Sequence, residues 1–149
     1  MTEIIPARIE IARKAGAVWV GNPDTENVVQ AMAHLEPGGI DIAFECAGQQ
    51  ETLDQAVDML KPGGTLMLIG IPRAERISFC PDSIRRKEIA IINVRRQNHC
   101  TQKAIDLIAE GKVNLDFMIT HTFEFDQSQR AFDLVADYKD GVVKALIRV

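Results

Sequence analysis

A carboxylate near the start of the chain, Glu3, is the first residue whose type and place suggest chemistry. It stands where an extended segment would pass into a helix that Pro6 can begin. An acidic side chain at the end of a parallel strand can accept hydrogen bonds from both ribose hydroxyls of a nucleotide and repel a 2′-phosphate. Glu3 is therefore a candidate for binding NAD in preference to NADP. The opposing interpretation, a solvated surface glutamate, stays open.

The segment that should precede such an acid is not found in this sequence. In nucleotide-binding folds of this kind, a G-x-G-x-x-G turn precedes the acidic residue by about 20 residues. Only two residues precede Glu3, and the chain contains no such turn. We therefore expect the chain to be the downstream part of a nucleotide-binding enzyme.

Helix-like and strand-like periodicities alternate along most of the chain, separated by Gly, Pro, Asn and Asp. This alternation predicts an α/β fold with a parallel sheet. Thr52 and Gln55 have the spacing of a capping box at the start of one helix. Expected helices begin near residues 6, 22, 52, 82, 101 and 126, and expected strands cover residues 17–20, 40–45, 65–69, 89–94, 119–125 and 142–149.

The strongest short string is residues 60–66, in which Gly63 and Gly64 allow a sharp turn from helix to strand. Its chemistry is structural. NAD-binding dehydrogenases and S-adenosylmethionine-dependent methyltransferases share the string, so it indicates the fold better than the function.

Three arginines are weaker candidates. Arg95 and Arg96 follow an apolar strand, at the carboxyl edge where ligands of parallel sheets bind. Arg8 could stack on an adenine ring or could be an exposed helix arginine. The basic clusters are small and lack interleaved aromatic residues, so nucleic-acid binding is not expected.

Composition describes an ordinary globular protein: 149 residues, 46% hydrophobic, 26% charged, with a net charge of −4. No apolar run approaches the roughly 18 residues of a membrane span, so we expect a cytoplasmic protein that binds no membrane. Cys46, Cys80 and Cys100 form no C-x-x-C pair and are expected to be reduced thiols. His34, His99 and His121 have no metal-ligand spacing and are expected to be structural.

Five segments, taken in order, resemble the medium-chain, zinc-dependent alcohol dehydrogenase family, and within it most closely the sorbitol (L-iditol) and other polyol dehydrogenases. They are residues 2–9, 41–48, 61–70, 94–98 and 119–123. The resemblance implies a GroES-like catalytic domain and a Rossmann-type domain with a doubly wound parallel sheet. It also implies oxidation of a secondary alcohol by hydride transfer to NAD, with a zinc ion that polarises the substrate oxygen.

The resemblance assigns cofactor-binding residues to this chain. Glu3 matches the acid on the ribose, and Arg8 matches an arginine beside the adenine. Other matches lie at the ends of the fourth, fifth and sixth strands of the family's sheet, where they line the cofactor cleft. They are Cys46, Ala47, Gly48, Ile69, Gly70, Ile71, Val94, Arg95 and Arg96.

The family's zinc ligands, proton relay and glycine-rich unit match nothing in this sequence. We therefore expect a partial NAD-binding Rossmann domain over residues 1–114, incomplete because its first strand, glycine turn and helix are missing. Residues 115–149 are expected to be a C-terminal segment that returns to the catalytic domain. No catalytic or metal-binding residue is expected here, and the chain is expected to be inactive alone.

Partners follow from the same resemblance. NAD and a polyol or other alcohol are expected in the full-length enzyme, and the strand from Ile89 to Val94 is expected to form a homo-oligomer by pairing with its symmetry mate. Two alternatives remain. One is a methyltransferase fragment, which a late antiparallel hairpin in the sheet would indicate. The other is a non-enzymatic module that associates with a full-length dehydrogenase.

Overall fold

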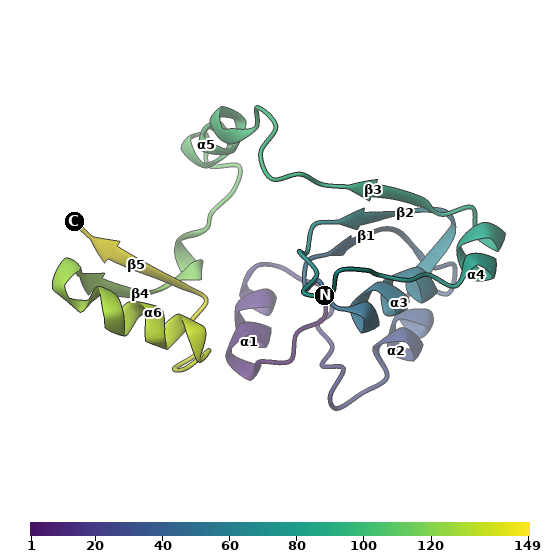
Figure 1. Ribbon diagram of the computed structural model, residues 1–149, viewed down its shortest axis with the longest axis horizontal. Helices are drawn as coiled ribbons and strands as arrows, with labels where there is room; N and C mark the ends of the chain where they lie inside the picture. Colours follow the sequence, from purple (N-terminus) through teal and green to yellow (C-terminus); the bar gives the residue numbers. More distant parts are fainter. The chain divides into compact units, whose positions relative to one another are not determined.

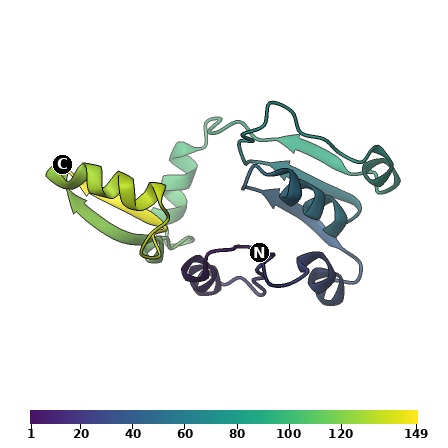
Figure 2. The ribbon, with the colours of Figure 1, turned by 60° about the horizontal axis from the view of Figure 1, so that its bottom comes forward.

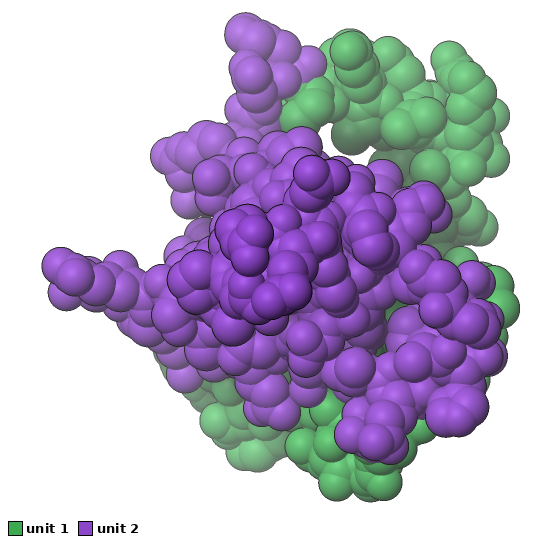
Figure 3. All heavy atoms as spheres, turned by 90° about the vertical axis from the view of Figure 1, so that its right-hand side faces the viewer, with its two compact units in different colours: residues 1–26, 100–149 green, residues 27–99 purple.

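The computed structural model describes residues 1–149 and divides them into two compact units, coloured separately in Figure 3. One unit comprises residues 27–99, and the other comprises residues 1–26 with residues 100–149. None of the helices combines the length and the apolar character needed to cross a bilayer. The predicted division into residues 1–114 and 115–149 concerns domains of the whole enzyme and stays a prediction.

A parallel three-stranded sheet forms the centre of the unit of residues 27–99 (Figure 1). Its strands lie in the order β1 (Ile40–Glu45), β2 (Leu60–Leu68) and β3 (Ala90–Asn93). Each connection between strands contains a helix, as parallel pairing requires: α3 (Gln50–Met59) and then α4 (Pro81–Arg86). α2 (Val28–Leu35) precedes β1. The predicted α/β class with an incomplete parallel sheet is therefore confirmed, and the sheet is small.

Only one face of this sheet is covered. Alternate residues of a strand point to opposite faces, and Ala43 and Leu66 pack against Leu53 and Val57 of α3, which lies across the sheet in Figure 2. The residues between them point the other way: Phe44 is 64% exposed, and Ile42 and Ile92 are also exposed. The core therefore lies between the sheet and α3.

A parallel strand pair organises the C-terminal part of the second unit. β4 (Ile119–Glu124) and β5 (Lys144–Arg148) pair in parallel, with α6 (Ser128–Ala136) between them in sequence. This is the opposite of the late antiparallel hairpin that the methyltransferase alternative requires. The remaining elements of this unit are α1 (Pro6–Lys14), α5 (Thr101–Ala109) and the single turns η1 (Asp116–Met118) and η2 (Phe125–Gln127).

The strand expected at residues 17–20 is wrong. Val18 is fully exposed, and the only pairing nearby is an isolated parallel bridge between Thr2 and Gly21. Gly21 donates to the Met1 carbonyl at 3.0 Å and accepts from the Glu3 N–H at 3.1 Å. Residues 17–20 are apolar enough for a strand, but the backbone offers them no ladder of partners, and a strand without a ladder is not stable.

Two helix starts also differ from expectation. α2 begins at Val28, because the Asn27 side chain accepts from the Gln30 N–H, while residues 22–25 form a turn. The capping box of Thr52 and Gln55 is wrong. α3 begins two residues earlier, at Gln50. The single proton of the Thr52 hydroxyl is shared between the Glu45 carboxylate at 2.7 Å and the Gln49 carbonyl at 2.9 Å.

Candidate functional site

The carboxyl ends of β1, β2 and β3 meet at one edge of the sheet, since Glu45 pairs with Leu68 and Leu68 pairs with Asn93. Ligands of parallel sheets bind outside such an edge. The segments that leave it contain nine of the residues predicted to bind the cofactor. They are Cys46, Ala47, Gly48, Ile69, Gly70, Ile71, Val94, Arg95 and Arg96.

Two glycines allow the loops after β1 and β2 to touch through their backbones. A Cβ atom on Gly70 would lie 2.3 Å from the Gly48 nitrogen, and a Cβ atom on Gly48 would lie 2.6 Å from the Ile71 carbonyl oxygen. Gly48 also has a φ of +68°, which favours glycine. Any side chain at either position would push the two loops apart and change the shape of the edge.

The Glu45 side chain, only 4% exposed, lies beneath this loop contact. Its Oε1 atom accepts hydrogen bonds from the Ala47 and Gly48 N–H groups, both at 2.8 Å, and from the Thr52 hydroxyl at 2.7 Å. Its backbone carbonyl accepts from the N–H groups of Ile69 at 2.9 Å and Gly70 at 2.8 Å. One residue thus binds both loops.

Sequence reasoning missed Glu45 and gave Thr52 a different role. The signal that could have found Glu45 is the alternation of the strand, which places it on the same face as the buried Ala43. A carboxylate on a buried face requires hydrogen-bond partners, and the following loop and Thr52 were the nearest donors in sequence.

The solvent-exposed side of this edge carries apolar side chains, and two arginines follow in the segment after β3. Ile71 is 79% exposed, and the side chains of Ile69 and Val94 are partly exposed. Arg95 and Arg96 are exposed in the segment after β3. The segment that follows Ile71 is held to α3, because the Gln50 amide donates to the Ser78 carbonyl at 2.8 Å and accepts from its N–H at 3.0 Å. The edge thus presents exposed apolar side chains to solvent, with two arginines in the segment after β3.

Glu3 and Arg8 belong to the other unit, so the structure does not join them to this edge. Glu3 Oε1 accepts from the N–H groups of Ile4 at 2.9 Å and Ile5 at 3.0 Å, at the start of α1. The Arg8 guanidinium donates to the Val142 carbonyl at 3.1 and 3.2 Å and lies 4.7 Å from the centre of the Tyr138 ring. These contacts give Arg8 a structural role, and its place beside an adenine stays a prediction.

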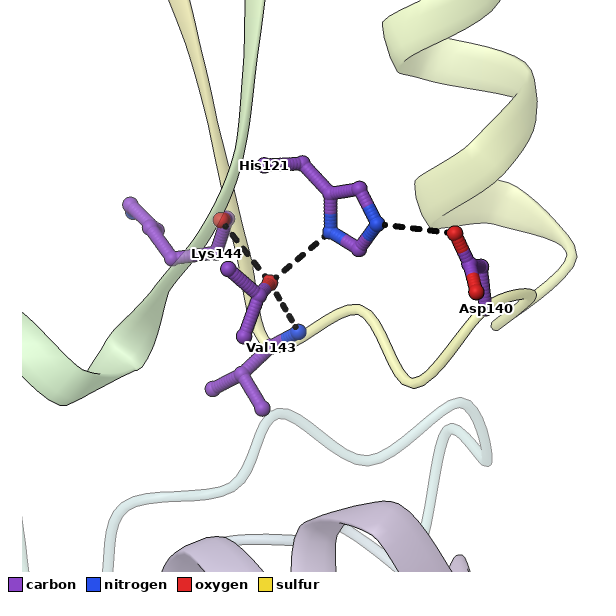
Figure 4. Close-up of polar contacts among 5 residues, drawn as sticks. His121, Asp140, Val143 and Lys144 are labelled. Carbon is purple, nitrogen blue, oxygen red and sulfur yellow. Dashed lines mark hydrogen bonds and ion pairs between the residues drawn. The ribbon is translucent and has the colours of Figure 1, made fainter.

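The histidines and acids of this chain do not fit a zinc ion. No three His, Cys, Asp or Glu residues converge as metal ligands. Figure 4 shows what His121 does instead: its Nδ1 atom bonds the Thr120 hydroxyl at 3.0 Å and its Nε2 atom bonds Asp140 at 3.2 Å. The Thr120 hydroxyl in turn donates to the Lys144 carbonyl and accepts from the Val143 N–H. This network ties β4 to the start of β5, in agreement with a structural histidine.

Comparison with known proteins identifies the family of this chain. The model of a family described as zinc-binding dehydrogenase matches residues 1–110. The chain belongs to this family. Its members among the similar proteins are alcohol and polyol dehydrogenases, and nothing in the comparisons supports a methyltransferase.

Two curated relatives show the extent of the match. An alcohol dehydrogenase of Cupriavidus necator is 33% identical over 145 residues, which are 95% of this chain and 40% of that protein. A sorbitol dehydrogenase of Bacillus subtilis (strain 168) is 26% identical over 148 residues, which are 99% of this chain and 42% of the relative. The chain therefore spans about two fifths of the length of these relatives.

A solved structure extends the match to three dimensions. A protein of Sinorhizobium meliloti 1021, described as a zinc-binding dehydrogenase bound to NADP, has a TM-score of 0.88 at 29% identity. The match covers 99% of this chain and 44% of that one. The resemblance to medium-chain zinc dehydrogenases is thus confirmed in sequence and in fold.

The two cysteines near the sheet should differ in reactivity. Burial, and then the charge of Glu45, raises the pKa of the Cys46 thiol. Hydrogen bonds from the Ser83 side chain and backbone lower the pKa of Cys80. Because the thiolate is the nucleophile, we expect iodoacetamide at neutral pH to alkylate Cys80 faster than Cys46, measured by mass spectrometry of peptides.

The control variant is Ser83→Ala, which should slow the alkylation of Cys80 and leave that of Cys46 unchanged. Equal rates for the two thiols in the wild-type chain would contradict these assignments.

Proposed function

We propose that the chain is the cofactor-domain portion of a zinc-dependent NAD(H) polyol or alcohol dehydrogenase, acting in the cytoplasm. The observation that supports this proposal is that the segments after β1, β2 and β3 leave the same edge of the sheet. These segments contain the residues that the resemblance to the family predicts to bind the cofactor. The reaction class is hydride transfer between a secondary alcohol and the nicotinamide ring. Because no residues here fit zinc, the chain alone should be inactive.

Within that reaction, the residues of this chain bind and orient the cofactor. The exposed side chains of Ile69, Ile71 and Val94 pack on the nicotinamide ring and exclude water from it. Arg95 and Arg96 lie close enough in sequence to the end of β3 to approach a cofactor phosphate or the substrate. When bound, the nicotinamide supplies the acceptor of the hydride.

The choice between NAD and NADP depends in this proposal on Glu3. Its Oε1 atom is engaged by the backbone of residues 4 and 5, which fixes the carboxylate at the start of α1. A fixed negative charge there would accept ribose hydroxyls and repel a 2′-phosphate. The S. meliloti relative is bound to NADP, so the preference of this chain needs its own measurement.

The measurement uses a fusion protein. In it, the segment of the Bacillus subtilis sorbitol dehydrogenase that lies before its match to this chain is joined to Met1. Glu3→Gln keeps an oxygen that accepts from the N–H groups of Ile4 and Ile5 but removes the charge. We expect the KM for NAD to rise about tenfold, the scale of a hydrogen bond to a charged group, and discrimination against NADP to fall. Sorbitol oxidation with each cofactor gives both values.

Glu10→Gln is the matched control, because Glu10 is an exposed glutamate on α1, and it should leave both KM values unchanged. If Glu3→Gln also leaves the cofactor preference unchanged, Glu3 has no role in binding the ribose.

We also propose that the protein is a homo-oligomer through β3. This strand pairs with β2 on one side only, and its other edge has no partner within the chain. Ile92, in the middle of β3, is exposed on the uncovered face of the sheet. An apolar strand edge of this kind favours pairing with a second copy across a two-fold axis.

Light scattering on the chain tests this pairing. Ile92→Lys places a positive charge on each of the two paired copies of β3, where like charges on neighbouring strands are destabilising, and should weaken association severalfold. Ile42→Lys places the same charge on the same uncovered face but on β1, and should leave association unchanged. A monomeric wild type, or an Ile92→Lys variant as associated as its parent, would count against the interface.

A further inference from the structure

Glu45 is the one buried charged residue of the chain, and the hydride transfer proposed above does not use it. The Oε1 atom of its carboxylate accepts three hydrogen bonds, from Ala47, Gly48 and Thr52. Burying a carboxylate is costly unless hydrogen bonds compensate. An apolar side chain of similar size would avoid that cost but would leave the same three donors without their acceptor.

We propose that Glu45 is a positioning residue for the nicotinamide cofactor: it holds the loops after β1 and β2 in the one arrangement that accepts the ring. The proposal rests on the proposed function. Its side chain fixes residues 46–48, and its carbonyl fixes Ile69 and Gly70. Both loops are therefore oriented by a residue that itself lies beneath them and does not reach the cofactor.

The hydrogen bonds also decide which part of the cofactor this edge can take. The N–H groups of Ala47, Gly48, Ile69 and Gly70 are all directed at Glu45. None of them is left to donate to a phosphate, which in nucleotide sites is commonly bound by backbone N–H groups. With Glu45 in place, the ends of β1 and β2 select an uncharged or cationic ring over a phosphate.

Hydrogen bonds to a charged acceptor are stronger than those to a neutral one. The affinity for the cofactor should therefore fall stepwise as the acceptor at position 45 is weakened and then removed. Glu45→Gln keeps an oxygen acceptor without the charge, whereas Glu45→Leu removes the acceptor altogether. A positioning role predicts the order wild type, then Gln, then Leu in affinity for the cofactor. Glu51→Gln, on the exposed side of α3, is the matched control and should behave as the wild type.

The experiment is an NADH titration of the complete ¹⁵N-labelled chain followed through its amide signals, together with amide hydrogen exchange without NADH. In the wild type, NADH should shift the signals of Gly48 and Gly70. Glu45→Leu should weaken NADH binding by at least about tenfold, and Glu45→Gln by a few-fold. In both variants exchange should quicken at Ala47 and Gly48 while the amide of Leu53, which donates to the carbonyl of Gln49 at the start of α3, keeps its protection.

The outcomes separate the two proposals. Wild-type NADH affinity in Glu45→Leu, with exchange quickened at Ala47 and Gly48, would overturn the positioning role and leave the proposed function intact. No amide shift at this edge in the wild-type chain, and none in the fusion with the Bacillus subtilis segment, would overturn the proposed function, and the positioning role with it. If only the fusion binds NADH, the same variants are compared in the fusion. If Glu45→Leu does not fold, the double variant Glu45→Gln, Thr52→Val is used instead. It weakens the acceptor at position 45 and removes the hydroxyl donor at position 52. An NADH affinity equal to that of the wild type in this double variant would also overturn the positioning role.

Discussion

Five hydrogen bonds converge on Glu45 and hold the loops after β1 and β2 at the carboxyl edge of the sheet. Backbone from the ends of two neighbouring parallel strands meets there, and glycine at positions 48 and 70 is required because a Cβ atom on either would lie within 2.6 Å of the other loop. The core beneath, from Ala43 and Leu66 to Leu53 of α3, fixes where the two strands end. The sheet, α3 and the two loops therefore pack together at this edge.

The two faces of the sheet serve different purposes. The face under α3 is closed and stabilises the unit by burying apolar area, whereas Phe44 and Ile92 lie on a face that this unit leaves open. Open apolar faces of this kind are uncommon on soluble monomers, and the relatives are more than twice as long as this chain. The chain spans about two fifths of the length of these relatives, and Phe44 and Ile92 remain exposed on this face.

Strand periodicity predicted β1, β2 and β3 because each strand carries its own signal: alternation or an apolar run between turn residues. It failed at residues 17–20, where apolar character was present but the partner strand offers only Thr2 for pairing. Thr52 had the spacing of a capping residue, yet its hydroxyl bonds a carboxylate seven residues earlier. The spacing of Thr52 does not reveal this tertiary contact. For Glu45 the alternation of β1 did carry a signal, because it places Glu45 on the buried face with Ala43, whereas Gly48 and Gly70 were identified through the family resemblance.

The central claim is that the carboxyl edge of β1, β2 and β3 receives the nicotinamide ring. Intermolecular nuclear Overhauser effects from the ring protons of bound NADH to the protein methyl groups test it most directly. We expect contacts with the methyl groups of Ile69, Ile71 and Val94 at this edge. Contacts confined to the opposite end of the strands, near Ile40 and Pro62, would contradict it.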